Sequence, residues 1–213
     1  MKGRRGITLH EILVVGVLMA LIATCLYWAL LPGIRAWRRS DTRADIQKTA
    51  LVAMKKIETE LRASDRSSLV ILKQNYQEKT TGRTLACDAI TFLSPFGRTG
   101  GLQYDTLSGS ILWQKHGVFY LQGETGTLHI QEDFFAPSDA PSPYQAGSFT
   151  PRPSADRVVA RNVKSLSFSA RQDGESGDTA LANPVTYELL IGIEHQDATF
   201  ISAVSAMHNG DQE

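Results

Sequence analysis

The sequence is poor in cysteine and carries no excess of charge of either sign. Its 213 residues include two cysteines, and its 22 lysines and arginines are matched by 22 aspartates and glutamates. Cys25 lies inside a hydrophobic run and Cys87 lies far beyond it, so the two do not form a disulfide framework. A formal charge of zero gives no overall field that would gather nucleic acid or acidic lipid. Either kind of binding would therefore need a local patch.

The sequence also lacks the spacings of known catalytic and metal-binding sites. It contains no G-x-S-x-G elbow, no phosphate-binding loop and no dinucleotide fingerprint. Its five histidines show no metal-ligand spacing and are expected to be surface or strand residues. They are His10, His116, His129, His195 and His208. The acidic residues Asp173, Glu175 and Asp178 lack a calcium-loop pattern and are expected to form a solvated turn. We therefore expect no catalytic residue, no metal site and no cofactor, and an enzyme on a membrane anchor is the least favoured function.

What the sequence has instead is one long hydrophobic run near its N-terminus. Residues 12–31 read ILVVGVLMALIATCLYWALL, without a charged side chain. A helix of twenty residues is about 30 Å long, which matches the hydrocarbon thickness of a bilayer. A buried core helix is rarely apolar on every side for five turns. We therefore predict a transmembrane helix over residues 7–33.

Basic residues flank this run on both sides. They are Lys2, Arg4 and Arg5 before it, and Arg35, Arg38, Arg39 and Arg43 after it. The first group resembles the start of a secretory signal peptide, but the run is longer than usual and no small-x-small cleavage site follows it. The distribution of positive charge leaves the orientation of the helix open. Together with Trp37, the second group is typical of an anchor at lipid headgroups, so we expect no contact with nucleic acid.

Glu11 is a carboxylate at the start of the hydrophobic run. A charged side chain at the centre of a bilayer costs about 2.5 to 3.5 kcal/mol, so an acid in this position calls for a partner. Cleavage after Gly6 would create an amino group at Ile7, four residues before Glu11. The two charges could then meet within one helical turn or across two adjacent helices. The alternative is a carboxylate at headgroup level, and these residues alone favour neither interpretation.

Residues 2–6 read KGRRG and residues 7–11 read ITLHE, and together they resemble the prepilin signature of type IV pilins and type II secretion pseudopilins. That signature is a basic leader ending in Gly, followed by a hydrophobic residue, Thr, Leu, another apolar residue and Glu. Here Ile7 stands where Phe is commonest, and His10 stands where an aliphatic residue is usual. The resemblance implies cleavage between Gly6 and Ile7 by an inner-membrane prepilin peptidase, and methylation of the Ile7 amine. It further implies that Glu11 pairs with the N-terminus of a neighbouring subunit, and that the leader, residues 1–6, is cytoplasmic.

Beyond Pro32 and Gly33, which are expected to kink or interrupt the helix, residues 41–63 show a helical period. Their apolar stripe consists of Ile46, Ala50, Ala53, Met54, Ile57 and Leu61. Charged residues fill the remaining positions, so the stripe can pack on a sheet while the other face stays in water. We predict an amphipathic stalk helix within residues 34–68.

Residues 69–213 are predicted to form a β-rich globular domain. The runs with β-strand character are residues 89–93, 110–115, 118–122, 127–132, 165–170, 186–194 and 199–206. His116 and Gly117 are expected to form a hairpin turn between the second and third runs. Two stretches without periodicity, residues 136–153 and 171–183, are predicted to be loops and are candidate partner-binding surfaces.

The order of these segments resembles the J-type minor pseudopilins and the W-type minor pilins. It consists of a helix, an early sheet, an insertion, the segment NVKSLSF at residues 162–168 and a final hairpin. The resemblance implies a pilin-like α+β fold, with a long N-terminal helix, half transmembrane and half amphipathic, packed on antiparallel β-sheet.

The same resemblance implies a minor pilin or pseudopilin that acts in the initiation of fibre assembly or at the fibre tip. Its expected partners are other minor and major subunits, the prepilin peptidase and the bacterial inner membrane, with the C-terminal domain in the periplasm. Secretion, twitching and DNA uptake use this architecture alike, so the sequence does not choose between them. The alternative is a bitopic membrane-anchored protein that binds a ligand or a surface, keeps its leader and never polymerises.

Overall fold

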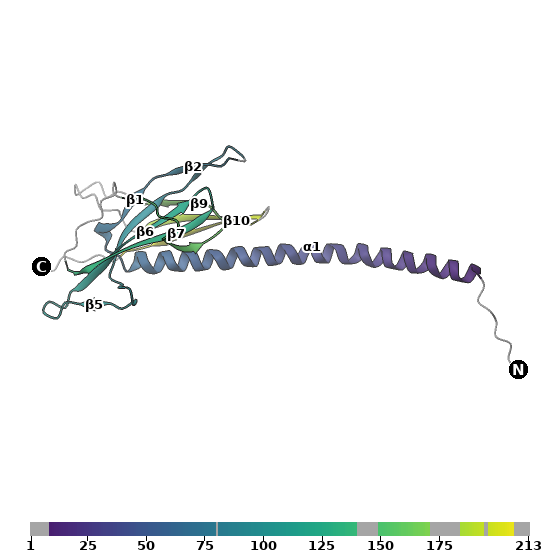
Figure 1. Ribbon diagram of the computed structural model, residues 1–213, viewed down its shortest axis with the longest axis horizontal. Helices are drawn as coiled ribbons and strands as arrows, with labels where there is room; N and C mark the ends of the chain where they lie inside the picture. Colours follow the sequence, from purple (N-terminus) through teal and green to yellow (C-terminus); the bar gives the residue numbers. More distant parts are fainter. Residues whose placement is uncertain (1–8, 80, 140–148, 171–183, 194–195, 207–213) are drawn as a thin grey trace. The chain divides into compact units, whose positions relative to one another are not determined.

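A computed structural model of the chain describes residues 9–79, 81–139, 149–170, 184–193 and 196–206 (Figure 1). Within these residues the structure is one long α-helix followed by antiparallel sheets, which confirms the predicted pilin-like α+β fold class. Contacts along the chain define two compact units, Met1–Asp45 and Ile46–Glu213. Helix α1 (Leu9–Arg62) contributes to both, and each unit is described by itself.

In the first unit, α1 contains the predicted hydrophobic run. It is long and apolar enough to cross a membrane, and none of its 18-residue apolar window is buried inside the structure. The helix continues through Pro32 without an interruption, so that half of the expectation was wrong, whereas a kink at Pro32 and Gly33 stays a prediction. A proline removes one backbone donor and crowds the carbonyl four residues before it. The alanine and leucine residues that precede Pro32 favour helix strongly enough to keep the backbone helical.

In the second unit, the end of α1 buries the predicted apolar stripe. Five of its six residues are buried, namely Ile46, Ala50, Ala53, Ile57 and Leu61, and Met54 is partly buried against them. This stripe is the helical contribution to a core shared with both sheets. Glu60 is buried on the same part of the helix, which the sequence interpretation did not anticipate. Leu51 and Val52 are apolar but exposed, with 66% and 55% of their surface accessible.

The larger sheet has six antiparallel strands in the order β1-β4-β6-β7-β8, with β5 paired to β6. Its strands are β1 (Val70–Leu72), β4 (Ala89–Ser94), β5 (Gln103–Tyr104), β6 (Ile111–Gln122), β7 (Thr127–Ser138) and β8 (Arg157–Ala160). The short helix η1 (Arg66–Ser68) connects α1 to β1. Figure 1 shows β6 and β7 side by side, as their pairing requires.

The smaller sheet has the order β11-β10-β9 and is also antiparallel. Its strands are β9 (Val163–Ser169), β10 (Val185–Ile193) and β11 (Gln196–Val204). A two-stranded ribbon pairs β2 (Asn75–Gln77) with β3 (Thr84–Ala86). Each of the seven predicted β runs overlaps one of the strands β4, β6, β7, β9, β10 and β11, whereas β1, β2, β3, β5 and β8 were not predicted. The predicted loop at 136–153 begins later than expected, because β7 extends to Ser138. Its residues 140–148, and the whole predicted loop 171–183, lie outside the described residues.

The predicted hairpin turn at His116 and Gly117 was wrong. Both residues lie in the middle of β6, where Gly117 is paired with Phe92 of β4. A Cβ atom on Gly117 would lie 2.2 Å from the Phe92 ring, which stacks on Phe119 at 5.2 Å between centroids. The glycine therefore makes room for a core aromatic ring and does not mark a turn.

Asp88, just before β4, joins the two sheets. Its carboxylate is buried and accepts hydrogen bonds from the backbone N–H of Phe168 at 2.9 Å and from Lys73 Nζ at 2.6 Å. Its own backbone N–H donates to the carbonyl of Leu166 in β9. Because a buried carboxylate is costly without donors, this position requires both sheets to be in place.

The helix is also tied to the smaller sheet by a polar contact. Glu58 accepts hydrogen bonds from Ser202 Oγ of β11 at 2.7 Å and from the Tyr187 hydroxyl of β10 at 3.3 Å. Burial raises the pKa of Tyr187, and the nearby Glu58 charge adds to this effect. The tyrosine therefore stays a hydrogen-bond donor over the physiological pH range.

Candidate functional site

The predicted processing site, Gly6 and Ile7, lies outside the described residues. Glu11 lies in the first turn of α1, where it and His10 are exposed. A carboxylate in the first turn of a helix is favourably placed toward the positive end of the helix dipole. Cleavage, methylation and pairing of Glu11 with a neighbouring N-terminus stay predictions.

The other residues considered from the sequence have no common site in the part of the chain that the structure describes. His116 and His129 lie in β6 and β7, as expected for strand residues, while His195, His208 and the acidic residues of 171–183 lie outside that part. Cys25 and Cys87 are both free, and burial with the nearby Asp88 charge raises the pKa of Cys87 to about 11. Among the described residues, no three His, Cys, Asp or Glu side chains form a group that could hold a metal ion.

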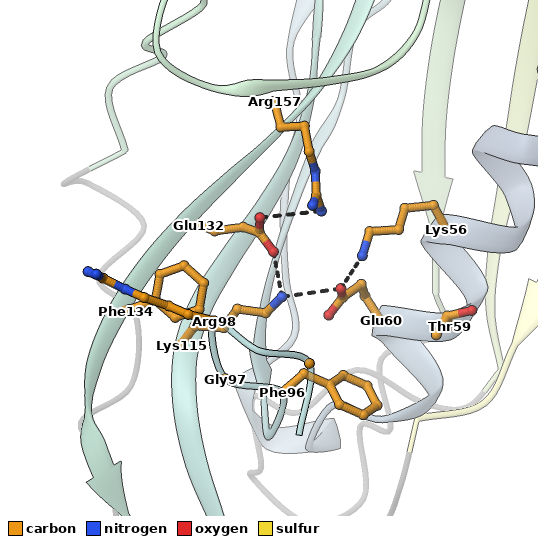
Figure 2. Close-up of a pocket in the computed structure, with 11 residues that line it drawn as sticks. Lys56, Thr59, Glu60, Phe96, Gly97, Arg98, Lys115, Glu132, Phe134 and Arg157 are labelled. Carbon is orange, nitrogen blue, oxygen red and sulfur yellow. Dashed lines mark hydrogen bonds and ion pairs between the residues drawn. The ribbon is translucent and has the colours of Figure 1, made fainter. Parts of the chain in front are cut away.

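The second unit contains a cavity of about 310 Å³ lined by charged and aromatic side chains, which we call the charged pocket (Figure 2). Six of its lining residues are charged, namely Lys56, Glu60, Arg98, Lys115, Glu132 and Arg157. Thr59, Phe96, Gly97, Gly100 and Phe134 complete the lining. Figure 2 shows that the side chains converge from α1, from three adjacent strands of the larger sheet and from the loop after β4.

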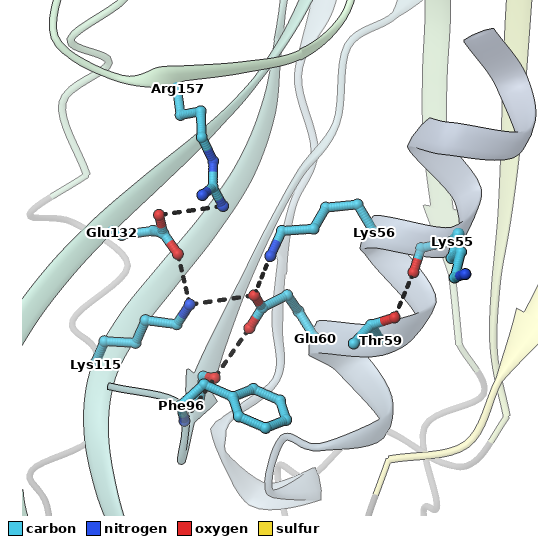
Figure 3. Close-up of polar contacts among 9 residues, drawn as sticks. Lys55, Lys56, Thr59, Glu60, Phe96, Lys115, Glu132 and Arg157 are labelled. Carbon is cyan, nitrogen blue, oxygen red and sulfur yellow. Dashed lines mark hydrogen bonds and ion pairs between the residues drawn. The ribbon is translucent and has the colours of Figure 1, made fainter. Parts of the chain in front are cut away.

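Glu60 lies at the centre of the polar contacts (Figure 3). Its Oε1 accepts hydrogen bonds from Lys56 Nζ at 2.5 Å and from Lys115 Nζ at 3.2 Å, and its Oε2 accepts one from Ser94 Oγ at 2.9 Å. Helix geometry explains the first contact, because residues four apart lie on the same side of the helix. It also explains the burial, because Glu60 follows Ile57 by three residues and so faces the sheet beside the apolar stripe.

Lys115 and Glu132 face the helix because of strand alternation. Lys115 lies two and four residues before Gly117 and Phe119 of β6, so it shares their core-facing side. Glu132 lies two residues after the buried Ile130 on β7 and points to the same side. Their side chains meet at 2.5 Å, and Arg157 Nη2 of β8 lies 3.3 Å from the other oxygen of Glu132. One chain of ion pairs therefore runs from α1 to β8.

Burial and pairing act in opposite directions on Glu60. Burial alone raises the pKa of this carboxyl, but the hydrogen bond from Lys56 and the charges of Lys115 and Lys56 together hold the pKa below its ordinary value. Glu60 is therefore ionised at neutral pH although only 3% of its side chain is exposed. Because charges inside a protein cost free energy unless they are paired, each member of the pocket depends on its partners.

Arg98 and Phe134 form the outer wall of the pocket. The Arg98 guanidinium lies 5.3 Å from the centre of the Phe134 ring and, in Figure 2, extends across it away from Glu60. Such a cation over an aromatic face is a favourable contact. The pocket thus combines an aromatic wall with hydrogen-bond donors, which is an arrangement suited to binding.

The sequence interpretation missed the charged pocket completely, although it contained two signals for it. Glu60 falls on the helical stripe between Ile57 and Leu61, and Lys115 falls on the alternation that leads back from Phe119. Because a turn was expected at His116 and Gly117, Lys115 was assigned to a different strand from Phe119. The alternation that links the two residues was therefore not recognised.

In comparisons with known proteins, no family model, no curated protein and no solved structure matches the chain. The chain can therefore be classified only by the architecture of its fold. It is an α+β protein of pilin-like fold, with an apolar N-terminal helix long enough to cross a membrane and packed, in its later part, on antiparallel sheets.

Proposed function

We propose that the chain is a minor pilin or pseudopilin subunit, made with a short leader and assembled into a periplasmic fibre of a type II secretion or type IV pilus system. One observation carries this proposal. A helix that is apolar on all sides and unburied along its 18-residue apolar window carries a carboxylate, Glu11, in its first turn, at the end of a prepilin-like segment. An apolar helix surface of this size needs lipid or other helices around it, and a fibre core supplies the latter.

Cleavage of the leader would create a partner for the Glu11 carboxylate. Cleavage after Gly6 leaves an ammonium group at Ile7, and the subunit can then leave the membrane with neighbouring helices packed against it. In the water-poor core of a fibre, the Glu11 carboxylate of one subunit pairs with the Ile7 ammonium of another. Because a buried charge is tolerated only when its partner is present, the pair would act as a check on the correct register of subunits.

The second unit offers a surface that fits the same packing. Leu51 and Val52 are exposed apolar residues on α1, beside the buried stripe of Ala50 and Ala53. In a fibre they would extend the contact between neighbouring helices beyond the transmembrane part. The chain would thus be a single-pass protein of the bacterial inner membrane before assembly, with its domain in the periplasm. Its partners would be other minor and major subunits.

A second candidate function has one observation in its favour. The charged pocket is a cavity with unusual chemistry, and it fits a bitopic membrane-anchored protein that binds a ligand and does not polymerise. The two functions differ in the fate of residues 1–6 and in whether the chain enters a fibre.

Fibre entry can be measured with the assembly machinery and major subunit of a fibre-forming host. Sheared fibres are collected, and the chain is quantified in them and in the membrane fraction by immunoblot. We expect the wild-type chain in the fibres and the Glu11→Gln variant retained in the membrane, because the uncharged amide cannot form an ion pair with an ammonium. Asp45→Asn, which neutralises an exposed acid further along α1, is the matched control and should behave as wild type. Equal amounts of wild type and Glu11→Gln in the fibres would contradict the proposed role of Glu11.

A further inference from the structure

The charged pocket has more positive than negative groups converging at its centre. Three cations, Lys56, Lys115 and Arg157, contact two carboxylates, Glu60 and Glu132. The difference is one positive charge. The fourth cation, Arg98, adds to this excess at the rim, and among the described residues it forms no ion pair with a carboxylate. One additional negative group in the pocket would therefore neutralise the excess positive charge at its centre.

The same side chains also have more free hydrogen-bond donors than free acceptors. Both oxygens of Glu60 and both oxygens of Glu132 already have a partner. In the contacts between described residues, Lys56 uses one of its three N–H donors on Glu60, and Arg157, which has five N–H donors, forms one ion pair with Glu132. The donors that remain on Lys56 and Arg157 therefore outnumber the acceptor sites that remain on the two carboxylates. A ligand that completes the site must bring acceptor atoms.

The available donors can be reached from solvent. Side-chain exposure is 32% for Lys56 and 56% for Arg157, whereas it is 4% for Lys115, which lies beneath them. Figure 2 shows the ends of Lys56 and Arg157 directed toward the space between Glu60 and Glu132. Lys115 thus fixes the two carboxylates in place, while Lys56 and Arg157 can each turn a free N–H toward an entering group.

The size and walls of the pocket limit what can enter. A volume of about 310 Å³ is at the lower end of ligand pockets, enough for one or two amino-acid residues. Phe96 and Phe134 are partly buried in the lining and supply apolar surface beside the charges. The two resident carboxylates would repel a doubly charged phosphate more strongly than a singly charged group.

We propose that the charged pocket binds a single carboxylate carried on an apolar body of one or two residues, with Lys56 and Arg157 as its direct partners. Two sources offer this chemistry, a segment of a partner protein with an acidic side chain and a free small carboxylic acid. The proposal does not depend on cleavage at Gly6 or on fibre assembly, so it can fail or succeed independently of the proposed function.

The test uses the full chain, labelled with [¹⁵N]glycine, in a nonionic detergent. Gly97 and Gly100 line the pocket and report binding there, while Gly123 and Gly126 lie elsewhere and report the state of the fold. The chain is titrated with N-acetyl-leucine and, separately, with the peptide acetyl-Leu-Glu-Leu-amide. N-acetyl-leucinamide and acetyl-Leu-Gln-Leu-amide are the uncharged controls. We expect the signals of Gly97 and Gly100 to move with the acids and not with the amides, with a dissociation constant on the order of 1 mM.

Variants connect the signal to the proposed partners. Lys56→Gln and Arg157→Gln should each weaken binding about tenfold or more, because each removes a charge-assisted hydrogen bond. Their matched controls, Lys55→Gln and Arg161→Gln, neutralise exposed neighbours and should bind as wild type. Unchanged signals of Gly123 and Gly126 show that each variant is folded.

The outcomes are distinct. Tighter binding of the peptide identifies a partner protein as the source of the carboxylate, and tighter binding of N-acetyl-leucine identifies a small acid; both support the proposal. Shifts of Gly97 and Gly100 that are equal for acids and amides would overturn it, since the pocket would then recognise only apolar groups. Absence of any shift, or wild-type affinity in both Lys56→Gln and Arg157→Gln, would overturn it as well.

Discussion

Replacing Lys115 with methionine is expected to lower the free energy of unfolding by about 3 kcal/mol at pH 7. Methionine keeps most of the length and volume of the lysine side chain but removes its charge. The charge lies between Glu60 and Glu132, at 3.2 Å and 2.5 Å, with 4% of the lysine side chain exposed. The substitution therefore leaves two carboxylates close together without the cation that separates them.

The size of this loss in unfolding free energy depends on the partners that each carboxylate still has in the variant. Removing one member of a buried ion pair costs about 3 to 5 kcal/mol, because the remaining charge stays desolvated and unpaired. Here Glu60 keeps Lys56 and Ser94, and Glu132 keeps Arg157 and is itself 17% exposed. These remaining partners place the cost at the lower end of that range.

The cost should also depend on pH, in a direction fixed by Glu60. In the wild-type protein, pairing holds the pKa of Glu60 below its ordinary value of 4.5. A lowered pKa contributes stability that is present above pH 4.5 and is lost as the pH falls through the folded-state value. Without Lys115, fewer positive charges counteract the effect of burial, so the pKa of Glu60 rises. Glu60 can then take up a proton at mildly acidic pH, so the difference between variant and wild type should shrink below about pH 5.

Urea unfolding of the full chain in a nonionic detergent, followed by tryptophan fluorescence, measures this effect. Trp113 is buried in β6, whereas Trp28 and Trp37 are exposed, so the change in emission reports the second unit. Lys55→Met, at an exposed position of the same helix, is the matched control and should change stability by less than about 0.5 kcal/mol. The double variant Glu60→Gln with Lys115→Met should cost less than the sum of the two single changes, because no unpaired Glu60 charge remains. A cost for Lys115→Met below about 1 kcal/mol, or one that stays constant from pH 7 to pH 4, would refute the reasoning.

The remaining predictions concern the core and the joint between the sheets. Gly117→Ala should lower the unfolding free energy by about 1 to 3 kcal/mol in the same urea assay, because the added methyl group meets the Phe92 ring; an unchanged midpoint would contradict this packing. Ile57→Ala should cost about 2 to 5 kcal/mol, since Ile57 is fully buried, and a loss below 1 kcal/mol would show that the helix face is not in the core. Asp88→Asn should cost about 1 to 3 kcal/mol, because Lys73 loses its ion pair and the Phe168 amide loses a charged acceptor; retention of wild-type stability would argue against the joint. Native Cys87 should resist alkylation by iodoacetamide at pH 8, because it is buried and its pKa is raised to about 11, and it should react after unfolding in urea; rapid labelling of the native protein, read by peptide mass spectrometry, would contradict its burial.

The helix and the strands whose apolar residues recur at regular intervals could be predicted from the sequence. The stripe from Ile46 to Leu61 repeats every three or four residues, and the structure buries it as expected. The longer strands, β4, β6, β7, β9, β10 and β11, were found because short β-like runs are separated by turn residues. These patterns are local, so they can be read without knowledge of the partner surface.

The contacts between distant segments could not be predicted in this way. Asp88 is buried because β9 supplies the Phe168 amide, and nothing near Asp88 in the sequence indicates that partner. Glu60 and Lys115 are 55 residues apart, and each looks like an ordinary surface charge until the helix and the sheet are placed together. Gly117 was interpreted as a turn because glycine is common in turns, whereas here it accommodates a ring from the neighbouring strand.

The central claim concerns residues 6 to 11, and intact mass with N-terminal sequencing tests it most directly. The full chain is expressed with and without a prepilin peptidase, and a Gly6→Ala variant is expressed beside it. Our account predicts that the wild-type chain loses Met1 to Gly6 only when the peptidase is present and then begins with methylated Ile7, while Gly6→Ala keeps its full length. Retention of Met1 to Gly6 in every case would contradict the account, and the bitopic binding protein would become the better description of this chain.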